Sequence, residues 1–337
     1  MPDCSDCPQK RPGFRGRWVA PRREVALSGI VNVDKPVGMT SHDVVDAVRR
    51  MAGQRKVGHA GTLDPLASGV LLVCLGQATR VVEYLMAGRK SYRSTILLGQ
   101  TTTTYDVEGE VVASGGRTDI SQAEIEAALA GFLGPIEQVP PVYSALKQQG
   151  QPLYKLARQG KEVEPLPRAV QIHGLELLEW VSPTLTVQVT CSPGTYVRSL
   201  AHDLGQRLGS GACLAGLVRL RSGRFSLEEA VSLDRLEEAF QHGQEADYLL
   251  PIDEALLDLP ALILSQADTQ RIVQGQFLGF HNSEPSIQNP ESRRSPSGDK
   301  IQNGMECRAY SSAGDLVAIL AYDAAISSWR PRKVFAA

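Results

Sequence analysis

The segment from Gly58 to Gly69 constrains what this chain can fold into more than any other stretch. It reads Gly-His-Ala-Gly-Thr-Leu-Asp-Pro-Leu-Ala-Ser-Gly and holds one imidazole, His59, and one carboxylate, Asp64, among glycines. The proline after Asp64 disfavours helical geometry at that aspartate, and the apolar run 70–75 follows directly. We therefore expect an extended Asp64 on a loop packed against a buried strand, as when a rigid fold presents one reactive group. Asp-Pro is also an ordinary turn dipeptide, so this stretch alone leaves a structural turn as the alternative.

Length and composition limit the class of protein. The 337 residues suffice for two domains, and 42% hydrophobic with 21% charged residues is ordinary for a globular chain. No apolar run approaches the roughly 20 residues of a membrane span, and the basic N-terminus lacks the apolar segment of a secretory signal. The formal net charge of −2 shows no overall cationic excess. The six scattered cysteines suggest neither a disulfide framework nor a zinc site, so we expect a cytoplasmic protein.

The apolar pattern predicts strands interleaved with capped helices. Strands are expected at 29–33, 70–75, 90–98, 170–180, 184–191, 214–225, 307–310 and 316–322. Helices are expected after Thr40 or Ser41, over 78–86, after the capping box 121–124, after Tyr196, after Ser226 and over 266–274. Within 214–225, the period of two is expected to place Leu217, Arg219 and Arg221 on one face.

Three stretches depart from this regular pattern. Residues 1–24 are basic and aperiodic, and residues 281–303 are rich in Ser, Pro and Asn, so both are expected to be disordered. Residues 140–168 interleave Tyr143 and Tyr154 with cations, which suits either RNA contact or a solvated helix face. A domain boundary is expected near 251–260.

Several separate motifs, in the right order, resemble the TruB family, the tRNA pseudouridine-55 synthases. The loop 58–69 resembles the family's catalytic motif, G-H-x-G-T-L-D-P. Further stretches resemble its other motifs: 34–41, 90–92, 141–147 with 153–158, 191–198 and 217–225. The resemblance covers most of residues 28–258, and the C-terminal piece is similar to the PUA-like module of bacterial members. Residues 1–24 and 281–303 match nothing expected in the family.

This resemblance implies an α+β fold with two ordered parts. Residues 25–258 would form the pseudouridine synthase fold, a central and mainly antiparallel sheet with flanking helices and an RNA-binding insertion at about 140–168. Residues 259–337 would form a small β-rich PUA-like module that contains the insert 281–303.

The resemblance also implies a role for each of several residues. Asp64 would be the essential carboxylate, acting either as a nucleophile or as a base that removes a sugar proton. Tyr92 looks like the ring that stacks on the flipped base and can assist proton transfer. Arg198 resembles the arginine that pairs with the catalytic aspartate and keeps it ionised.

The remaining pocket residues follow in the same way. His59 would help to fill the gap left by the flipped uridine, Tyr196 would be a second pocket ring, and Leu217 an apolar wall. RNA contacts are expected from Lys35, Lys147, Lys155 and Arg158, with a structural role as the alternative for Lys35. Taken alone, each pocket residue has a structural role as its alternative: a loop hydrogen bond for His59, a core position for Tyr92, and a surface cation for Arg198.

The implied activity is that of an isomerase that converts uridine to pseudouridine in the T-loop of tRNA after flipping the base. The reaction leaves the net oxidation state unchanged, so no cofactor is expected, and the sequence carries no metal motif. A glycosidase would need two carboxylates roughly 5–10 Å apart, whereas the loop supplies one. The alternatives are a non-catalytic tRNA-binding or folding chaperone and a synthase directed by a guide RNA. We expect tRNA, bound through its T-arm, as the partner of a monomer that needs neither a membrane nor another protein.

Overall fold

The computed structural model describes residues 26–144, 146–148, 150–153, 156, 159, 165–279 and 302–335. The expectations for residues 1–24, for Lys155 and Arg158, and for most of the insert 281–303 lie outside these ranges. Contacts within the chain define two compact units. The first contains residues 31–73 and 85–248, and the second contains residues 26–30, 74–84 and the chain after Tyr248.

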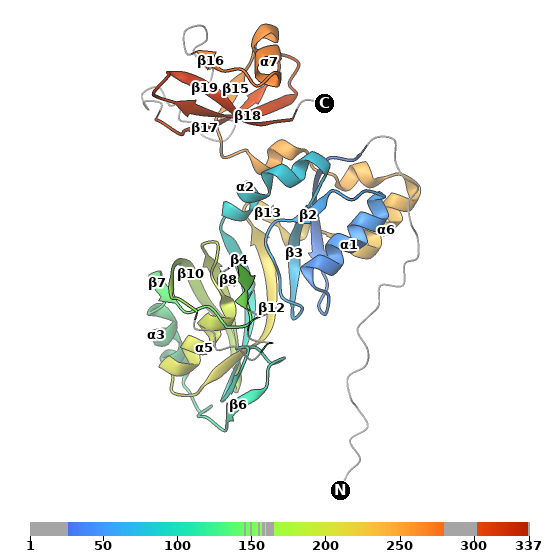
Figure 1. Cartoon of the computed structure of the whole chain (residues 1–337). Helices are drawn as coiled ribbons and strands as arrows, with labels where there is room; N and C mark the ends of the chain where they lie inside the picture. The colour runs from blue at the N-terminus through green and yellow to red at the C-terminus, as the bar shows by residue number, and fades with distance from the viewer. Residues whose placement is uncertain are drawn as a thin grey trace. The chain divides into compact units, whose positions relative to one another are not determined.

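Ten strands of the described chain form one mixed sheet, with the order β14-β1-β3-β12-β4-β11-β10-β7 and with β13 and β2 at the side. Figure 1 shows its strands β3, β12, β4 and β10. Antiparallel pairs join β12 to β4, β4 to β11, β11 to β10 and β10 to β7, while β3–β12 and β1–β14 are parallel. The strands span Gly29–Lys35 (β1), Val57–His59 (β2), Ala67–Leu75 (β3), Lys90–Leu98 (β4), Gly134–Gln138 (β7), Arg168–Val181 (β10), Thr184–Cys191 (β11), Ala212–Ser222 (β12), Phe225–Ser226 (β13) and Val231–Ser232 (β14). The prediction of an α+β fold around a mainly antiparallel sheet is confirmed.

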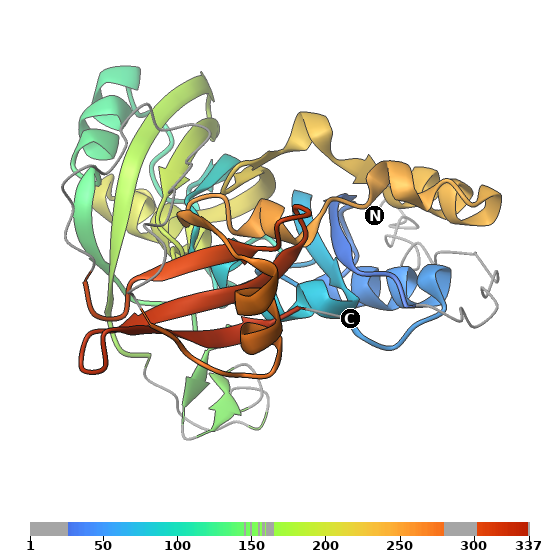
Figure 2. The ribbon, with the colours of Figure 1, turned by 90° about the horizontal axis from the view of Figure 1, so that it is seen from above.

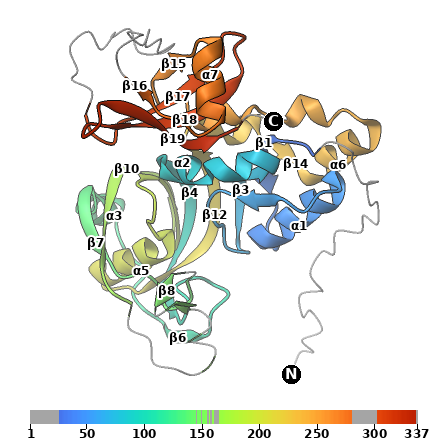
Figure 3. The same ribbon diagram turned by 45° about the horizontal axis from the view of Figure 1, so that its top comes forward.

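Helices begin and end where the sequence supplies caps. Helix α1 (Ser41–Ala52) starts with the side chain of Thr40 accepting from the Asp43 amide and ends at Gly53, whose φ is 61°. Helix α3 (Gln122–Ala130) starts with the predicted Ser121–Glu124 capping box. Helices α5 (Val197–Arg207) and α6 (Leu233–His242) complete this unit; α3 and α5 pack on the half of the sheet that contains β10 and β12, and α6 packs on α1 (Figure 3).

The remaining helices and strands of this part of the chain are short. The predicted helix 78–86 is a 3₁₀ helix, η1 (Gly76–Val81), followed by α2 (Val82–Ala87). Two small hairpins pair β5 (Gln100–Thr102) with β6 (Val111–Ser114), and β8 (Lys147–Gln148) with β9 (Gln151–Pro152). Further 3₁₀ turns span Leu227–Glu229 (η2), Glu245–Tyr248 (η3) and Ile252–Ala255 (η4).

The second unit contains a β-rich C-terminal sheet with the order β15-β17-β18-β19-β16, against which helix α7 packs (Figure 2). The elements are Ala261–Ile263 (β15), Gln266–Val273 (α7), Leu278–Gly279 (β16), Glu306–Tyr310 (β17), Leu316–Asp323 (β18) and Ser328–Val334 (β19). The predicted hairpin is confirmed, because β17 and β18 pair antiparallel. Ile272 from α7 and Trp329 from β19 are both buried in the core of this sheet.

One prediction about the sheet is wrong. Arg219 lies opposite Tyr92 of β4, but Arg221 lies opposite Ser91 because the register of β12 shifts by one residue between them. Successive residues of a strand face opposite ways, so this bulge turns Arg221 away from the face that carries Leu217 and Arg219. Arg219 is buried and Arg221 is exposed.

None of the described helices is long and apolar enough to cross a membrane.

Candidate active site

The loop between β2 and β3 is fixed by hydrogen bonds from the segment that leads into α1 and by one within the loop. The hydroxyl of Ser41, at the start of α1, accepts from the amide of Leu63 at 2.8 Å and donates to its carbonyl at 3.0 Å. The amide of Gly38 donates to the carbonyl of Pro65 at 2.8 Å, and within the loop the amide of Ala67 donates to the carbonyl of Asp64 at 3.0 Å. Asp64 therefore lies on a loop with little freedom, next to the fully buried residues 70–75 of β3.

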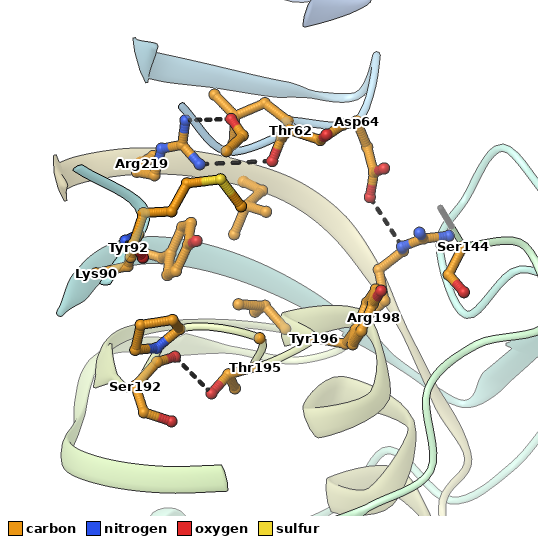
Figure 4. Close-up of a pocket in the computed structure, with 17 residues that line it drawn as sticks. Thr62, Asp64, Lys90, Tyr92, Ser144, Ser192, Thr195, Tyr196, Arg198 and Arg219 are labelled. Carbon is orange, nitrogen blue, oxygen red and sulfur yellow. Dashed lines mark hydrogen bonds and ion pairs between the residues drawn. The ribbon is translucent and has the colours of Figure 1, made fainter. Parts of the chain in front are cut away.

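The side chain of Arg219, from β12, also fixes this loop through hydrogen bonds to its backbone carbonyls. The residue is only 2% exposed, and its guanidinium donates from Nε to the carbonyl of Val70 at 2.7 Å. It also donates from Nη2 to the carbonyl of Gly61 at 3.1 Å and from Nη1 to that of Thr62 at 3.5 Å (Figure 4). The backbone of Arg219 passes close to Gly69, which has a φ of 95°, and a Cβ at Gly69 would lie 2.3 Å from the carbonyl oxygen of Arg219. Only glycine fits this position without strain.

Arg198, in the first turn of α5, forms the centre of a charged network. Its Nε lies 2.9 Å from Oδ2 of Asp64, and the two side chains point toward one another (Figure 4). Its Nη1 donates to Oδ2 of Asp106 at 3.3 Å and to the carbonyl of Thr104 at 3.2 Å, and its Nη2 donates to the carbonyl of Tyr143 at 3.0 Å. A buried guanidinium needs acceptors for its donors, so these contacts fix its orientation toward Asp64.

The two carboxylates of this network differ in exposure. The side chain of Asp106 is 6% exposed, whereas that of Asp64 is 40% exposed and is open to a ligand. Burial raises the pKa of Asp64 above its ordinary value of 3.8, the guanidinium of Arg198 opposes that rise, Asp106 adds to it, and Lys35 opposes it. Arg198 thus favours the ionised form of Asp64, as the sequence analysis expects, but partial burial outweighs it and the net pKa lies above the ordinary value.

Asp64 and Arg198 open into a cavity of about 270 Å³ (Figure 4). Tyr92 from β4, Tyr196 at the N-terminus of α5 and Leu217 from β12 supply aromatic and apolar wall. The full lining is Gly61, Thr62, Leu63, Asp64, Met86, Lys90, Tyr92, Ser144, Ser192, Pro193, Gly194, Thr195, Tyr196, Val197, Arg198, Leu217 and Arg219. Among these described residues Asp64 is the only carboxylate, so the cavity combines one reactive acid with surfaces suited to a planar ring.

The two tyrosines are held in different ways. Tyr92 is paired on both sides within the sheet, with Val189 of β11 and Arg219 of β12, and burial raises the pKa of its phenol. Gln138 holds the backbone of Tyr196, accepting from its amide at 2.7 Å and donating to its carbonyl at 2.9 Å. Burial also raises the pKa of the Tyr196 phenol, so both hydroxyls stay protonated at neutral pH.

Two family models match consecutive parts of this chain. The model of the TruB family pseudouridylate synthase N-terminal domain matches residues 49–197, and that of the tRNA pseudouridylate synthase B C-terminal domain matches residues 198–257. A protein named tRNA pseudouridine synthase B from Syntrophotalea carbinolica is 49% identical over 249 residues, which cover 74% of this chain and 81% of that relative. A protein of the same name from Dehalococcoides mccartyi is 41% identical over 309 residues, which cover 92% of this chain and 97% of the relative.

The chain belongs to the TruB family. The family and enzyme class predicted from the sequence are therefore confirmed: this is a pseudouridine synthase, an isomerase that acts on uridine in RNA. Solved structures agree on the fold. This TruB-family chain is similar to a chain of an H/ACA ribonucleoprotein bound to a substrate RNA containing 2′-deoxyuridine, with a TM-score of 0.67 and 25% identity over 92% of this chain and 85% of that one. It also resembles a chain of the archaeal box H/ACA Nop10–Cbf5 complex, with a TM-score of 0.65 and 26% identity over 91% and 86% of the two chains.

The structure brings together most of the site residues expected of a TruB-family protein. Asp64, Tyr92, Tyr196, Arg198 and Leu217 all line the one cavity. They come from the β2–β3 loop, β4, the start of α5 and β12. Their spacing along the sequence gives no hint of this proximity, which the sheet order creates by placing β12 between β3 and β4.

Two residues expected at the RNA do not line the cavity: His59, expected to fill the gap left by the flipped uridine, and Lys35. His59 ends β2 and is not among the lining residues; its Nδ1 is buried without a hydrogen-bond partner among the described residues, and burial lowers its pKa. Lys35 has no exposed surface, and its ammonium group donates to the carbonyls of Pro36 at 2.8 Å and Met39 at 2.6 Å. Burial lowers its pKa to about 8. Of the two roles expected for Lys35, a structural one and an RNA contact, these contacts support the structural one, in which it braces the turn before α1. Lys147 begins β8 and stays a predicted RNA contact.

Sequence reasoning missed two residues of the site. Asp106 lies in the Thr-rich loop 99–109, where no periodic pattern marks it, and only its place in an Asp-Val-Glu-Gly turn distinguishes it. Arg219 lies within a matched stretch, but the sequence did not show that its side chain points under the catalytic loop. The described residues contain no cluster of His, Cys, Asp and Glu that could hold a metal ion.

Proposed function

We propose that this protein is a tRNA pseudouridine-55 synthase, which isomerises uridine in the T-loop of tRNA. The observation that carries this proposal is the solvent-open carboxylate of Asp64, paired at 2.9 Å with the buried Arg198 in a cavity walled by Tyr92, Tyr196 and Leu217. The names of the relatives from Syntrophotalea carbinolica and Dehalococcoides mccartyi support tRNA as the substrate.

The reaction breaks the N-glycosidic bond of uridine, turns the base and rejoins it to the sugar through carbon, so no atom is gained or lost. The uridine first leaves its stack, at a free-energy cost of a few kcal/mol that contacts in the cavity offset. The ring of Tyr92, the side chain of Leu217 and the ring of Tyr196 are placed to contact the flipped base. Asp64 then acts on the sugar, either as a nucleophile or as a base that removes a sugar proton.

The network around Asp64 suits either role. Both roles need an ionised carboxylate, and Arg198 favours that form while burial disfavours it. A carboxylate whose pKa is raised by burial is more basic and less solvated than a free one. The protonated phenol of Tyr92 can donate or relay a proton near the base. A hydrolytic glycosidase would require a second carboxylate in the cavity, and none of the described lining residues supplies one.

The same proposal covers the parts of the chain and its partners. Residues 25–258 form the catalytic domain, with the RNA-binding insertion at about 140–168, and residues 259–337 form a PUA-like module. The protein acts in the cytoplasm as a monomer on the T-arm of tRNA, without a cofactor or an obligate protein partner. The isomerisation needs no redox group, which supports the absence of a cofactor.

Two other functions are weaker. A non-catalytic tRNA-binding or folding role leaves the Asp64–Arg198 pair without a purpose, although assistance to tRNA folding can coexist with catalysis. A synthase directed by a guide RNA is suggested by the H/ACA neighbours, which are 25–26% identical. The relatives named tRNA pseudouridine synthase B are 41–49% identical and favour direct recognition of tRNA.

One experiment tests the proposal. The full chain is incubated with an unmodified tRNA transcript without cofactor or guide RNA, and pseudouridine is mapped by carbodiimide adduct formation and primer extension. We expect product at the T-loop uridine from the wild type and none detectable from Asp64→Asn, which changes one atom of the side chain. Product from Asp64→Asn would reject the role of Asp64. Binding of tRNA without product from either protein would favour the chaperone, and product only after addition of guide RNA would favour the guided synthase.

A further inference from the structure

Tyr105 adopts a backbone conformation that its side chain disfavours. Its φ is 64°, and Ser327 is the only other non-glycine residue of the described chain with a positive φ. A large side chain at positive φ brings its Cβ close to backbone oxygen, so this conformation persists only where the surroundings impose it. The residue immediately before the carboxylate of Asp106 is therefore held in place by something around it.

The purpose of this turn is visible in the acceptors on either side of Tyr105. The carbonyl of Thr104 and the carboxylate of Asp106 both accept from Nη1 of Arg198, at 3.2 and 3.3 Å. The left-handed residue between them turns both acceptors toward the same nitrogen. The turn is also tied to β12, because the amide of Leu214 donates to the carbonyl of Tyr105 at 2.9 Å.

The ring of Tyr105 reaches the helix that carries Arg198. It stacks on the imidazole of His202, with ring centroids 4.0 Å apart and planes inclined by 14°. His202 follows Arg198 by one helical turn on α5, so both side chains project from one side of that helix. Burial lowers the pKa of His202, which favours the neutral ring in this stack.

We propose that Tyr105 and His202 are a pair of positioning residues for catalysis. Their stack holds the turn whose Thr104 carbonyl and Asp106 carboxylate aim Arg198 at Asp64. Neither ring lines the cavity, so both act through the guanidinium rather than on the substrate. The inference rests on the proposed function in so far as the Asp64–Arg198 pair performs the isomerisation.

Four variants separate the stack from the backbone strain. Tyr105→Gly removes the ring and leaves a residue that adopts positive φ freely, so it relieves strain while it abolishes the stack. His202→Ala removes the other ring and leaves the turn sequence intact. Tyr105→Phe removes only the hydroxyl and His202→Phe replaces the imidazole by a larger apolar ring, so both keep a ring at each position and serve as conservative controls.

The experiment uses the full chain and two readouts. The first is the single-turnover rate of pseudouridine formation on a tRNA transcript, together with the Kd for tRNA. The second is the pKa of the Asp64 carboxyl, followed by carbon-13 NMR and assigned with Asp64→Asn. That pKa reports the alignment of Arg198, because the charged groups that act on Asp64 are Arg198 on α5, Asp106 and Glu108 on the loop after β5, and Lys35 in β1.

We expect Tyr105→Gly and His202→Ala each to slow the single-turnover rate about fivefold to tenfold, which lies within the roughly twofold to tenfold that the loss of an aromatic stack allows. The double variant should be slower than either single variant by no more than about twofold, since the two rings act as one unit. The Phe variants should keep a rate within about twofold of the wild type, and the Kd for tRNA should not change. The pKa of Asp64 should rise in Tyr105→Gly and His202→Ala, because a misaligned guanidinium stabilises the carboxylate less.

The opposite results overturn the inference. A wild-type rate and an unchanged Asp64 pKa in Tyr105→Gly would show that the ring only compensates for strain. A lower melting temperature with an unchanged rate and pKa would show a brace for the fold with no effect on the site. A wild type that makes no pseudouridine would refute the proposed function instead, and the Asp64 pKa in the variants would still decide the role of the stack.

Discussion

Replacing Asp106 by asparagine gives the sharpest test of how the site is organised. Asp106 accepts three hydrogen bonds: Oδ1 from the hydroxyl of Thr104 at 2.6 Å and from the amide of Glu108 at 3.1 Å, and Oδ2 from Nη1 of Arg198 at 3.3 Å. An asparagine has one acceptor oxygen and one donor nitrogen. If its oxygen keeps the bonds to the turn, its nitrogen faces the donor of Arg198; if it flips, the turn loses both of its bonds.

The magnitude follows from this conflict. A hydrogen bond to a charged group contributes about 1.5–3 kcal/mol, and the substitution removes the one between Asp106 and Arg198 while it sets two donors against each other. If Arg198 is aimed at Asp64 only when that bond is present, the rate of the chemical step should fall about 10-fold to 150-fold. The affinity for tRNA should change little, because Asp106 is buried and does not line the cavity.

The assay is single-turnover formation of pseudouridine with enzyme in excess over a tRNA transcript, beside filter binding for the Kd. Asp119→Asn is the matched control, because it makes the same chemical change on a side chain that is 87% exposed and that pairs with the exposed Arg117. A rate for Asp106→Asn within about twofold of the wild type would refute the reasoning, since the lost bond would then have no bearing on Arg198. A large loss of tRNA affinity at an unchanged rate would refute it as well.

Three further predictions test other parts of the site. Tyr92→Phe should slow turnover while the Kd for tRNA stays nearly unchanged, because it removes only the protonated hydroxyl beside the base; a large loss of affinity would show that Tyr92 mainly anchors RNA. Asp64→Asn should be more resistant to urea than the wild type at neutral pH, because the raised pKa of Asp64 means that its ionised form destabilises the folded state. The difference should shrink as the pH falls through that pKa and the carboxyl becomes protonated. Equal resistance at every pH would contradict the raised pKa. Gly69→Ala should lower the free energy of unfolding by about 2–4 kcal/mol in urea denaturation, because of both its φ of 95° and the contact with Arg219. The control Gly115→Ala, with a φ of 80° and open space around it, should lose only about 1 kcal/mol. Equal losses would exclude the contact as a cause.

The sequence predicted local elements well where the signal is local. The Thr40 and Ser121 caps, the Gly53 stop and the alternation in β11 each depend on a few neighbouring residues, and the structure has them where expected. The helix 78–86 was only partly right, because apolar spacing does not separate a 3₁₀ turn from an α-helix. The bulge between Arg219 and Arg221 carries no signal in composition, so the period of two failed there.

The candidate site shows the same division. The unusual loop marked Asp64 as a candidate but left a structural turn as the alternative, and its catalytic role, like its partners Tyr92, Arg198 and Tyr196, came through resemblance to a family. Asp106 could not, because its role depends on the guanidinium of Arg198, 92 positions later in the chain. For Lys35 the sequence left a structural role and an RNA contact open, because a lysine in a motif gives no sign of whether its charge is buried and satisfied by carbonyls.

The hydrogen bonds from Arg219 to the catalytic loop restrict which mutations this segment of the sequence can accept. One side chain binds the carbonyls of Gly61, Thr62 and Val70 together, so the length of chain between Thr62 and Val70 is fixed from below. Surface loops normally tolerate insertions and deletions, but an added residue here would have to bulge into the cavity, and a missing one would pull Asp64 away from Arg198. Genetic change in this segment should therefore proceed by substitution alone, and a library of single-codon insertions across it should yield no active members.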